Sequence, residues 1–296
     1  MRLRVIALYC ALAIALSWGF QALAITMGGD INSDNARIWL AATMLTPLAL
    51  TIGFLVLHPP ARRGFLWKPS WALWPLLAVG FVVPTLTAFA YVAIMQAVGW
   101  GESGWFAFDA GGVDVAGGPW VLGLGPQDWG RFIANVLLTG AMFSALNGLL
   151  AAGEEFAWRG FLQGQLVRRF GLTKGVLLLG LFWAAWHFPA QALGYNHPDY
   201  PLLGALVLSP IQLIASSFFL AWLTIRAGSF WPAAIAHGAV NSIREGVISD
   251  VALTVAPIHK DLVLIALEIG IGLLCWAALK RSRLDSTGSA TDTHAP

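Results

Sequence analysis

Long apolar runs constrain this chain more than any other feature. Eight of them, each of about 20 residues, are separated by shorter polar segments, and the 296 residues are 58% hydrophobic and 11% charged. A helix needs about 20 apolar residues to cross the hydrocarbon core of a bilayer, whereas a soluble domain carries about 25% charged residues. Lipid cannot satisfy backbone polar groups, so spanning segments of this length must be helical. The sequence therefore predicts an all-α, polytopic transmembrane helix bundle with about eight spans.

The positions of these runs give the expected spans. The first run includes Ala22-Leu23-Ala24, which is similar to a signal-peptidase site. Its apolar stretch of about 20 residues exceeds the 7–15 residues of a signal-peptide core, so we interpret it as an uncleaved span. The eight expected spans are 5–27, 38–57, 71–98, 132–152 with a continuation, 175–193, 202–225, 230–248 and 262–279.

The distribution of lysine and arginine predicts the orientation of the bundle, because these residues are enriched in cytoplasmic loops. With a cytoplasmic N-terminus, four of them fall at outer ends of spans and twelve at inner ends. We therefore expect both termini to be cytoplasmic. The net charge is +2, and the basic residues lie between the apolar runs, so the charge gives no indication of nucleic-acid binding. The inner residues are Arg2, Arg4, Arg62, Arg63, Lys68, Arg168, Arg169, Lys174, Arg226, Lys280, Arg281 and Arg283.

Two polar segments lie outside the expected spans. Residues 101–130, on the outer side, are rich in Gly, Asp and Trp and predict an irregular loop at the membrane interface. Residues 284–296 are rich in Ser and Thr and predict a disordered tail. We expect His197, in the segment between two spans, to be an exposed turn residue. Cys10 and Cys275 lie within apolar runs and do not predict a disulfide framework.

Polar side chains within the apolar runs are the candidate functional residues, because a charge at mid-membrane costs about 2.5–3.5 kcal/mol on insertion scales. Glu154, His187 and His237 each lie 11 to 14 residues from a basic residue at the inner boundary. At 1.5 Å per residue this is a depth of about 17–21 Å. Three spans that are distant in sequence therefore bring polar groups to one level. The full set is Glu154, Glu155, Arg159, His187, His237, Asn241, Arg244, Glu245 and Glu268.

Helical spacing divides the two adjacent carboxylates. Glu155 and Arg159 are four residues apart and can pair on one face of a helix. Glu154 points about 100° away from that face, toward the face of Trp158 and Phe161. We therefore expect different roles for the two carboxylates. The pairing of Glu155 with Arg159 could also be purely structural.

These residue types suit the hydrolysis of an amide. A carboxylate in a dry site can act as general base on a water, and a histidine can share or orient the proton. His237 and Asn241, one turn apart on one face, can donate hydrogen bonds to an oxyanion. One Glu and two His could instead form an open zinc site. The histidines and Asn241 could also be interhelical hydrogen-bonding groups without a catalytic role.

Three charged residues of the candidate set are not assigned to this chemistry. Arg244 and Glu245 lie near the outer end of their span, and we expect them to be interfacial. Glu268 interrupts the last span and has no partner at helical spacing, so a partner would have to come from across the bundle. We assign Glu268 no catalytic role.

Three motifs that follow one another along the chain, built around Glu154, His187 and His237, together resemble the signature of the CPBP intramembrane proteases, the CAAX-processing and bacteriocin-protection group. The resemblance covers roughly residues 149–241, a third of the chain. The second motif of that family usually begins with Phe, whereas Trp183 stands here, so we expect an altered pocket shape with the chemistry retained. The motifs are Glu154-Glu155-x-x-x-Arg159, His187 with an aromatic residue four positions earlier, and His237-x-x-x-Asn241 after a Trp-Pro pair.

The resemblance implies an intramembrane endopeptidase that hydrolyses a membrane-associated peptide or protein, without a cofactor and with zinc as the alternative. It also implies a bacterial cytoplasmic membrane as the location. The expected regions are N-terminal spans and outer loop (1–130), a CPBP-like core (131–250), a C-terminal span (251–283) and the tail (284–296). In the implied roles, Glu154 and His187 activate water, His237 and Asn241 form the oxyanion site, and Glu155 with Arg159 supports the first motif.

Two other classes of function fit the same residues. A non-catalytic membrane scaffold or immunity-type protein could use the fold to bind a peptide. A proton-coupled transporter could use buried Glu and His as a relay, although the chain has no repeated halves of the kind that many transporters have.

Overall fold

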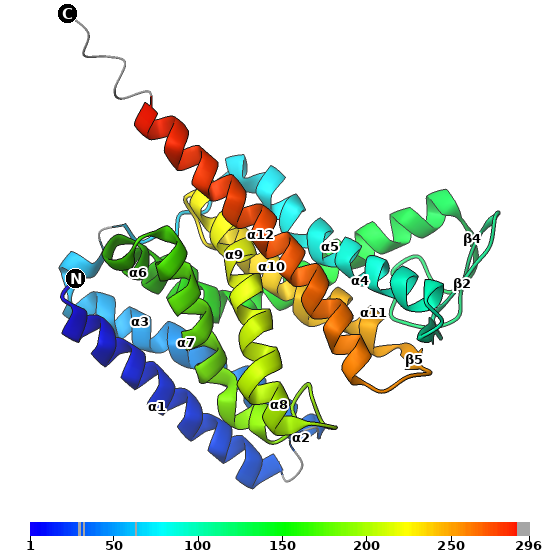
Figure 1. Ribbon diagram of the computed structural model, residues 1–296, viewed down its shortest axis with the longest axis horizontal. Coiled ribbons are helices and arrows are strands. Elements are labelled where there is room, and N and C mark those ends of the chain that lie inside the picture. The colour runs from blue at the N-terminus through cyan, green and yellow to red at the C-terminus, as the bar shows by residue number, and fades with distance from the viewer. Residues whose placement is uncertain (29–30, 32, 63, 289–296) are drawn as a thin grey trace, which may run out of the picture.

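The computed structural model describes residues 1–28, 31, 33–62 and 64–288, and its architecture is a helical bundle (Figure 1). The helices are α1 (Leu3–Gly28), α2 (Asp34–Thr43), α3 (Leu45–Leu57), α4 (Trp74–Ala97), α5 (Trp129–Glu155), α6 (Gln163–Phe170), α7 (Leu172–Ala192), α8 (Pro201–Leu203), α9 (Ser209–Ala227), α10 (Trp231–Ala239), α11 (Glu245–Ser249) and α12 (Ile258–Gly288).

The predicted membrane bundle is confirmed. Among the described residues, six helical segments are long and apolar enough to cross a membrane: Leu3–Met27, Ile38–Leu57, Trp74–Ala97, Trp129–Phe170, Pro201–Ala227 and Ile258–Ser282. The other two expected spans are also helical, as α7 and as the continuous run of α10, η5 (Val240–Arg244) and α11. These two segments carry the two histidines of the predicted site. The chain is a multi-pass membrane protein.

The two ends of the bundle differ in structure. Figure 1 places the N-terminus, the C-terminal end of α12 and α6 toward one end, and the strands toward the other. The cytoplasmic location of both termini stays a prediction. Helix α12 continues to Gly288, so residues 284–288 of the expected tail are helical, and residues 289–296 lie outside the described residues.

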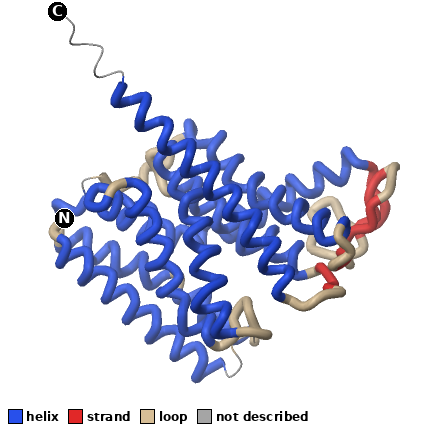
Figure 2. The backbone as a smooth tube through the Cα atoms, viewed as in Figure 1, coloured by secondary structure: helices blue, strands red, loops and turns tan. Residues whose placement is uncertain are grey.

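The outer segment is more ordered than the sequence indicates. Within the expected irregular loop, β2 (Phe106–Phe108), β3 (Gly112–Val115) and β4 (Gly125–Asp128) form an antiparallel three-stranded sheet, drawn in red in Figure 2. A further pair joins β1 (Gly101–Ser103) to β5 (Val251–Leu253). The aromatic and Val side chains of this segment pack on the outer halves of α4 and α5. Their burial supplies the order that the Gly-rich composition does not indicate.

Three π-helical segments interrupt the helices around the predicted site. They are η3 (Phe156–Leu162), which follows α5 directly, η4 (Gly204–Leu208), which precedes α9, and η5, which follows α10. Short 3₁₀ segments η1 (Pro59–Arg62) and η2 (Trp71–Leu73) lie before α4. A π-helical turn rotates the side chains that follow it, and such turns are frequent at functional sites.

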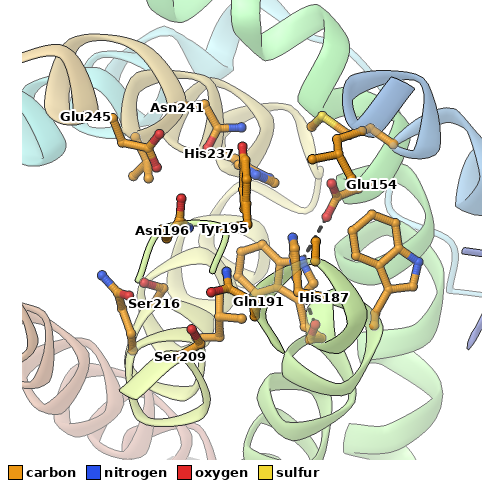
Figure 3. A pocket seen from close by; sticks show the side chains of 18 of the residues that line it. Glu154, His187, Gln191, Tyr195, Asn196, Ser209, Ser216, His237, Asn241 and Glu245 are labelled. Atoms are coloured by element: carbon orange, nitrogen blue, oxygen red, sulfur yellow. Dashed lines mark hydrogen bonds between the residues drawn. The ribbon is translucent and has the colours of Figure 1, made fainter. Parts of the chain in front are cut away.

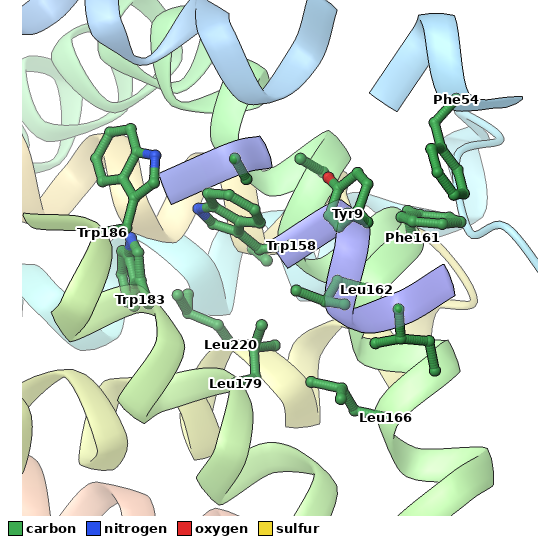
Figure 4. Close-up of a cluster of buried hydrophobic side chains, with 14 of the residues drawn as sticks. Tyr9, Phe54, Trp158, Phe161, Leu162, Leu166, Leu179, Trp183, Trp186 and Leu220 are labelled. Carbon is green, nitrogen blue, oxygen red and sulfur yellow. The ribbon is translucent and has the colours of Figure 1, made fainter. Parts of the chain in front are cut away.

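A cluster of buried aromatic and aliphatic side chains supports the inner half of the bundle (Figure 4). Phe161 of η3 contacts Tyr9 of α1 and Phe54 of α3, with ring centroids 5.0 and 5.8 Å apart. The Tyr9 hydroxyl and the Thr51 hydroxyl lie 2.6 Å apart and hydrogen-bond to each other. The first motif is therefore packed from behind by the N-terminal helices.

Helices α5 and α10 approach each other through glycine. A Cβ added at Gly238 would lie 2.3 Å from the Gly148 nitrogen and 2.6 Å from the Ser144 carbonyl oxygen. Small residues allow such close backbone contact between membrane helices. Because Gly238 follows His237 directly, this contact brings the third motif against the helix that carries the first.

Two expectations about single residues are wrong. His197 is buried, 5% exposed, and its Nδ1 lies 3.3 Å from an Asp261 oxygen. Arg244, expected at the interface, is also buried and forms an ion pair with Glu268. In both cases the partner lies on α12, and a charged group can be buried once another helix supplies its partner.

Candidate active site

Glu154 lies at the end of α5 and is 1% exposed. Its Oε2 accepts hydrogen bonds from the indole nitrogens of Trp183, at 2.8 Å, and Trp158, at 3.2 Å. The bond to Trp158 spans four residues, as the predicted helical face requires. Both indoles donate to the same oxygen, which stabilises a carboxylate without a basic partner and leaves Oε1 available to the cavity.

Glu155 belongs to a different set of contacts, as the helical spacing predicts. Its Oε1 accepts from Arg159 Nη1 at 3.0 Å and from His237 Nδ1 at 2.9 Å. Arg159 Nη2 also donates to the Ser217 hydroxyl at 3.2 Å, and its guanidinium carbon lies 4.3 Å from the centre of the Trp183 ring. The carboxylate therefore links the first motif to the third, and Arg159 supplies the compensating charge.

His187 stands near the end of α7, and its tautomer follows from its contacts. Its Nδ1 lies 3.0 Å from the Trp183 carbonyl oxygen. Because a carbonyl oxygen can only accept, Nδ1 must carry the proton. The Nε2 lone pair of a neutral His187 is then free to accept a proton or orient a water.

Side chains of α1 complete the broken hydrogen bonding of α7 next to His187. Pro189 has no N–H for the Ala185 carbonyl, and the Trp18 indole donates to that oxygen at 2.9 Å. One residue on, Gln21 donates to the Trp186 carbonyl at 2.8 Å and accepts from the Ala190 N–H at 3.0 Å. The first span therefore fixes the geometry of the segment that carries His187.

The motif residues converge on a cavity of about 300 Å³. Glu154, His187, His237 and Asn241 all line it, and Figure 3 shows the two imidazoles between Glu154 and the opposite wall. Glu155 and Arg159 do not line it but hold His237 from behind. The equal depths inferred from residue counts are thus matched by a shared cavity.

The arrangement can polarise a water and stabilise a developing negative charge. Glu154 Oε1 and His187 Nε2 can act as hydrogen-bond acceptors, while His237 and Asn241 can act as donors. Among the described residues, no group of three or more His, Cys, Asp or Glu side chains is placed to hold a metal ion. The side chains as arranged do not fit a three-ligand zinc site.

Sequence reasoning missed several contributors. Trp183 was expected only as an aromatic wall, but it donates to Glu154. The role of Trp18 and Gln21 was not predicted, although Pro189 within an expected span signals a carbonyl that needs another donor. Arg244 lines the same cavity, as do its partner Glu268 and the neighbouring Glu245.

Comparisons with known proteins agree with these motifs. A family model described as type II CAAX prenyl endopeptidase Rce1-like matches residues 134–243. One curated relative, CAAX prenyl protease 2 of Methanococcus maripaludis, is 46% identical over 41 residues, which are 14% of this chain and 15% of the relative. The matched family region contains all three motifs and the cavity residues of α5, α7 and α9. Residues 134–243 are therefore similar to the Rce1-like type II CAAX prenyl endopeptidases, a match over less than half of the chain.

Proposed function

We propose that this protein is an intramembrane endopeptidase in which Glu154 activates a water for attack on a peptide bond. The observation that carries the proposal is the convergence of Glu154, His187, His237 and Asn241 on one cavity of about 300 Å³. The family match supports endopeptidase activity in general. Cleavage needs no covalent enzyme intermediate, because water is the nucleophile.

In the proposed reaction, the water oxygen attacks the carbonyl carbon and its proton passes to Glu154. His187, with Nδ1–H held by the Trp183 carbonyl, orients this water through Nε2. The tetrahedral intermediate then breaks its carbon–nitrogen bond while Glu154 returns the proton to the leaving amine. One carboxylate thus serves as base and then as acid.

His237 and Asn241 stabilise the oxyanion in this proposal. The Nδ1–H of His237 donates to Glu155, so Nε2 can donate to an oxyanion only when the ring carries both protons. The buried Glu155 carboxylate stabilises that imidazolium, and Arg159 forms an ion pair with the same carboxylate. Loss of one oxyanion donor typically lowers kcat by about 10²–10³.

The substrate class follows from the relative and the site together. The relative's name indicates action on prenylated CAAX proteins, and we propose a membrane-associated peptide or protein of that type as substrate. The cavity lies among helices long and apolar enough to cross a membrane, which suits a substrate held at the membrane. A bacterial cytoplasmic membrane is the proposed location.

The test uses purified full-length protein in liposomes and a quenched fluorescent peptide ending in a CAAX box, with and without a farnesyl group. We expect wild-type protein to cleave it, and Glu154→Gln, His187→Ala and His237→Ala each to lower kcat by at least about 10². Ser144→Ala, which removes a buried hydroxyl outside the cavity, should leave kcat unchanged.

The outcomes separate the candidate functions. Full activity in Glu154→Gln would remove this residue from the mechanism. Peptide binding without cleavage by the wild type would favour the scaffold, and proton-coupled uptake into the liposomes would favour the transporter. Loss of activity after chelation, restored by zinc alone, would require a metal-dependent mechanism in place of the one proposed.

A further inference from the structure

The wall of the cavity opposite Glu154 is unusually polar. Five side chains from four elements line it: Gln191, Ser209, Gln212, Arg244 and Glu268. Each is an amide, a hydroxyl or a charged group, within a bundle whose other surfaces are largely apolar. Figure 3 shows Gln191 and Ser209 on the far side of the imidazoles from Glu154. The catalytic proposal uses none of these groups.

Several polar atoms of this wall have no partner. Arg244 and Glu268 form an ion pair, and Gln212 donates to Glu268 at 3.4 Å. Even so, Gln191 Oε1, Ser209 Oγ, Arg244 Nε and Glu268 Oε2 are buried without a hydrogen bond. Their residues are 4–7% exposed. Buried polar atoms are nearly always satisfied, so four such atoms around one cavity make this wall a candidate site for a polar ligand.

The wall lies about one helical turn from the groups proposed for catalysis. Gln191 follows His187 by four residues on α7, and Arg244 follows Asn241 by three residues on η5. One turn is about 5.4 Å, and an extended chain advances about 3.3–3.6 Å per residue. The wall therefore faces the residues next to the scissile bond.

The chemistry of the wall matches a peptide main chain. Arg244 Nε is a free donor, Gln191 Oε1 and Glu268 Oε2 are free acceptors, and Ser209 can act as either. A peptide group offers one N–H and one C=O. A terminal carboxylate would fit less well, because Glu154, Glu245 and Glu268 line the cavity against one guanidinium, and like charges brought together are repelled.

We propose that Gln191, Ser209, Arg244 and Glu268 form a substrate subsite that binds uncharged main-chain peptide groups beside the scissile bond. The subsite deepens the proposed endopeptidase function and rests on it. Selectivity for internal peptide groups follows, because the wall offers both a free donor and free acceptors, as a main chain requires.

Matched variants test the subsite. Gln191→Leu removes from the cavity an amide whose Oε1 has no partner, whereas Gln163→Leu removes a buried amide on α6, outside the cavity, whose Oε1 also has no partner. We expect Gln191→Leu to raise KM by about three- to tenfold, the effect of one lost hydrogen bond, with little change in kcat. Ser209→Ala should act similarly. Gln163→Leu and Ser144→Ala should leave KM unchanged.

Binding is measured separately from cleavage, so that failure of the subsite and failure of the function can be distinguished. A fluorescein-labelled, farnesylated CAAX peptide is titrated against Glu154→Gln protein, with Gln191→Leu or Gln163→Leu added. Weaker binding with only the former supports the subsite, even if the wild type cleaves nothing. If the protein cleaves the peptide but Gln191→Leu has the same KM and Kd as Gln163→Leu, the subsite would be overturned and the function would stand. Absence of binding would overturn it as well.

A second peptide pair tests the chemistry of the ligand. The CAAX peptide is compared with the same peptide carrying a C-terminal amide. A main-chain subsite predicts that amidation leaves kcat/KM unchanged or raises it. A fall of tenfold or more, abolished by Arg244→Gln with Glu268→Gln, would show that the wall receives a carboxylate and would overturn the proposal.

Discussion

At the scale of single residues, the site depends on separating two adjacent carboxylates. Glu155 meets a guanidinium and an imidazole, whereas Glu154 meets two indole N–H groups. A hydrogen bond from an indole holds the Glu154 carboxylate in place without adding a cation beside it. Glu155 instead orients His237. The sequence indicated this division, because a shift of one residue turns a helix by about 100°.

A substitution that keeps the ring tests the role of Trp183. Trp183→Phe removes the 2.8 Å bond to Glu154 and retains an aromatic side chain. Hydrogen bonds to charged groups contribute about 1.5–3 kcal/mol, but Trp158 remains as a second donor, so we expect kcat to fall by only about tenfold. Steady-state kinetics with the quenched peptide measure this effect.

A matched control and a double variant complete that test. Trp276→Phe removes an indole bond to the Thr173 hydroxyl on the outside of the cavity and should leave kcat unchanged. Trp158→Phe combined with Trp183→Phe should lower kcat by more than the product of the single effects, because the carboxylate then has no donor. Strict additivity would indicate that the indoles do not act on one carboxylate.

At the scale of elements, α7 holds His187 beside a proline and needs α1 to do so. Trp18 donates to the Ala185 carbonyl, to which Pro189 cannot donate because it has no N–H. Gln21 bridges the Trp186 carbonyl and the Ala190 N–H. Loss of the Gln21 contacts and loss of the Trp18 contact should affect α7 differently. The two groups held by Gln21 are four residues apart and can bond to each other if Gln21 is lost, whereas the Ala185 carbonyl has no such alternative.

The two α1 variants should therefore behave differently. Gln21→Leu allows the turn after His187 to close, so we expect a fall in kcat with little change in Tm. Trp18→Phe leaves a carbonyl unsatisfied, which costs about 1–3 kcal/mol, so we expect a lower Tm. Thermal unfolding in detergent and peptide cleavage measure the two effects. Equal losses of Tm in both variants would contradict this account, and Gln163→Leu serves as the control.

At the scale of the whole molecule, the N-terminus and the C-terminal end of α12 lie toward one end of the bundle and the strands toward the other (Figure 1), so we expect them on opposite sides of the membrane. The protein has two cysteines, Cys10 and Cys275. When both are replaced by alanine, a single introduced cysteine can be labelled and its side of the membrane determined. In that background, Glu102→Cys lies in β1 and Arg169→Cys in α6, both at exposed positions. With the N-terminus cytoplasmic, a membrane-impermeant maleimide should label the first in intact cells and the second only after permeabilisation. The reverse pattern would invert the topology.

The positions of the helices could largely be predicted from sequence, and those of the loops could not. All eight expected spans are helical because apolar length and the lack of backbone partners in lipid act locally. Residues 101–130 form strands because Phe106, Val113 and Val115 are buried against α4 and α5, a contact that composition does not encode. His197 and Arg244 were misplaced for the same reason, since each is buried only because α12 supplies a carboxylate.

By itself, the sequence determined the membrane class, the pairing of Glu155 with Arg159 and the shared depth of Glu154, His187 and His237. These depend on spacing along one helix or on distance from a boundary, which counting residues can supply. Only the tertiary structure decided which donors hold Glu154, that Glu155 reaches His237, that α1 supports α7, and that Arg244 and Glu268 line the same cavity. Each of these contacts joins segments far apart in the chain, and its formation depends on how helices pack, as at Gly238, where α10 meets α5.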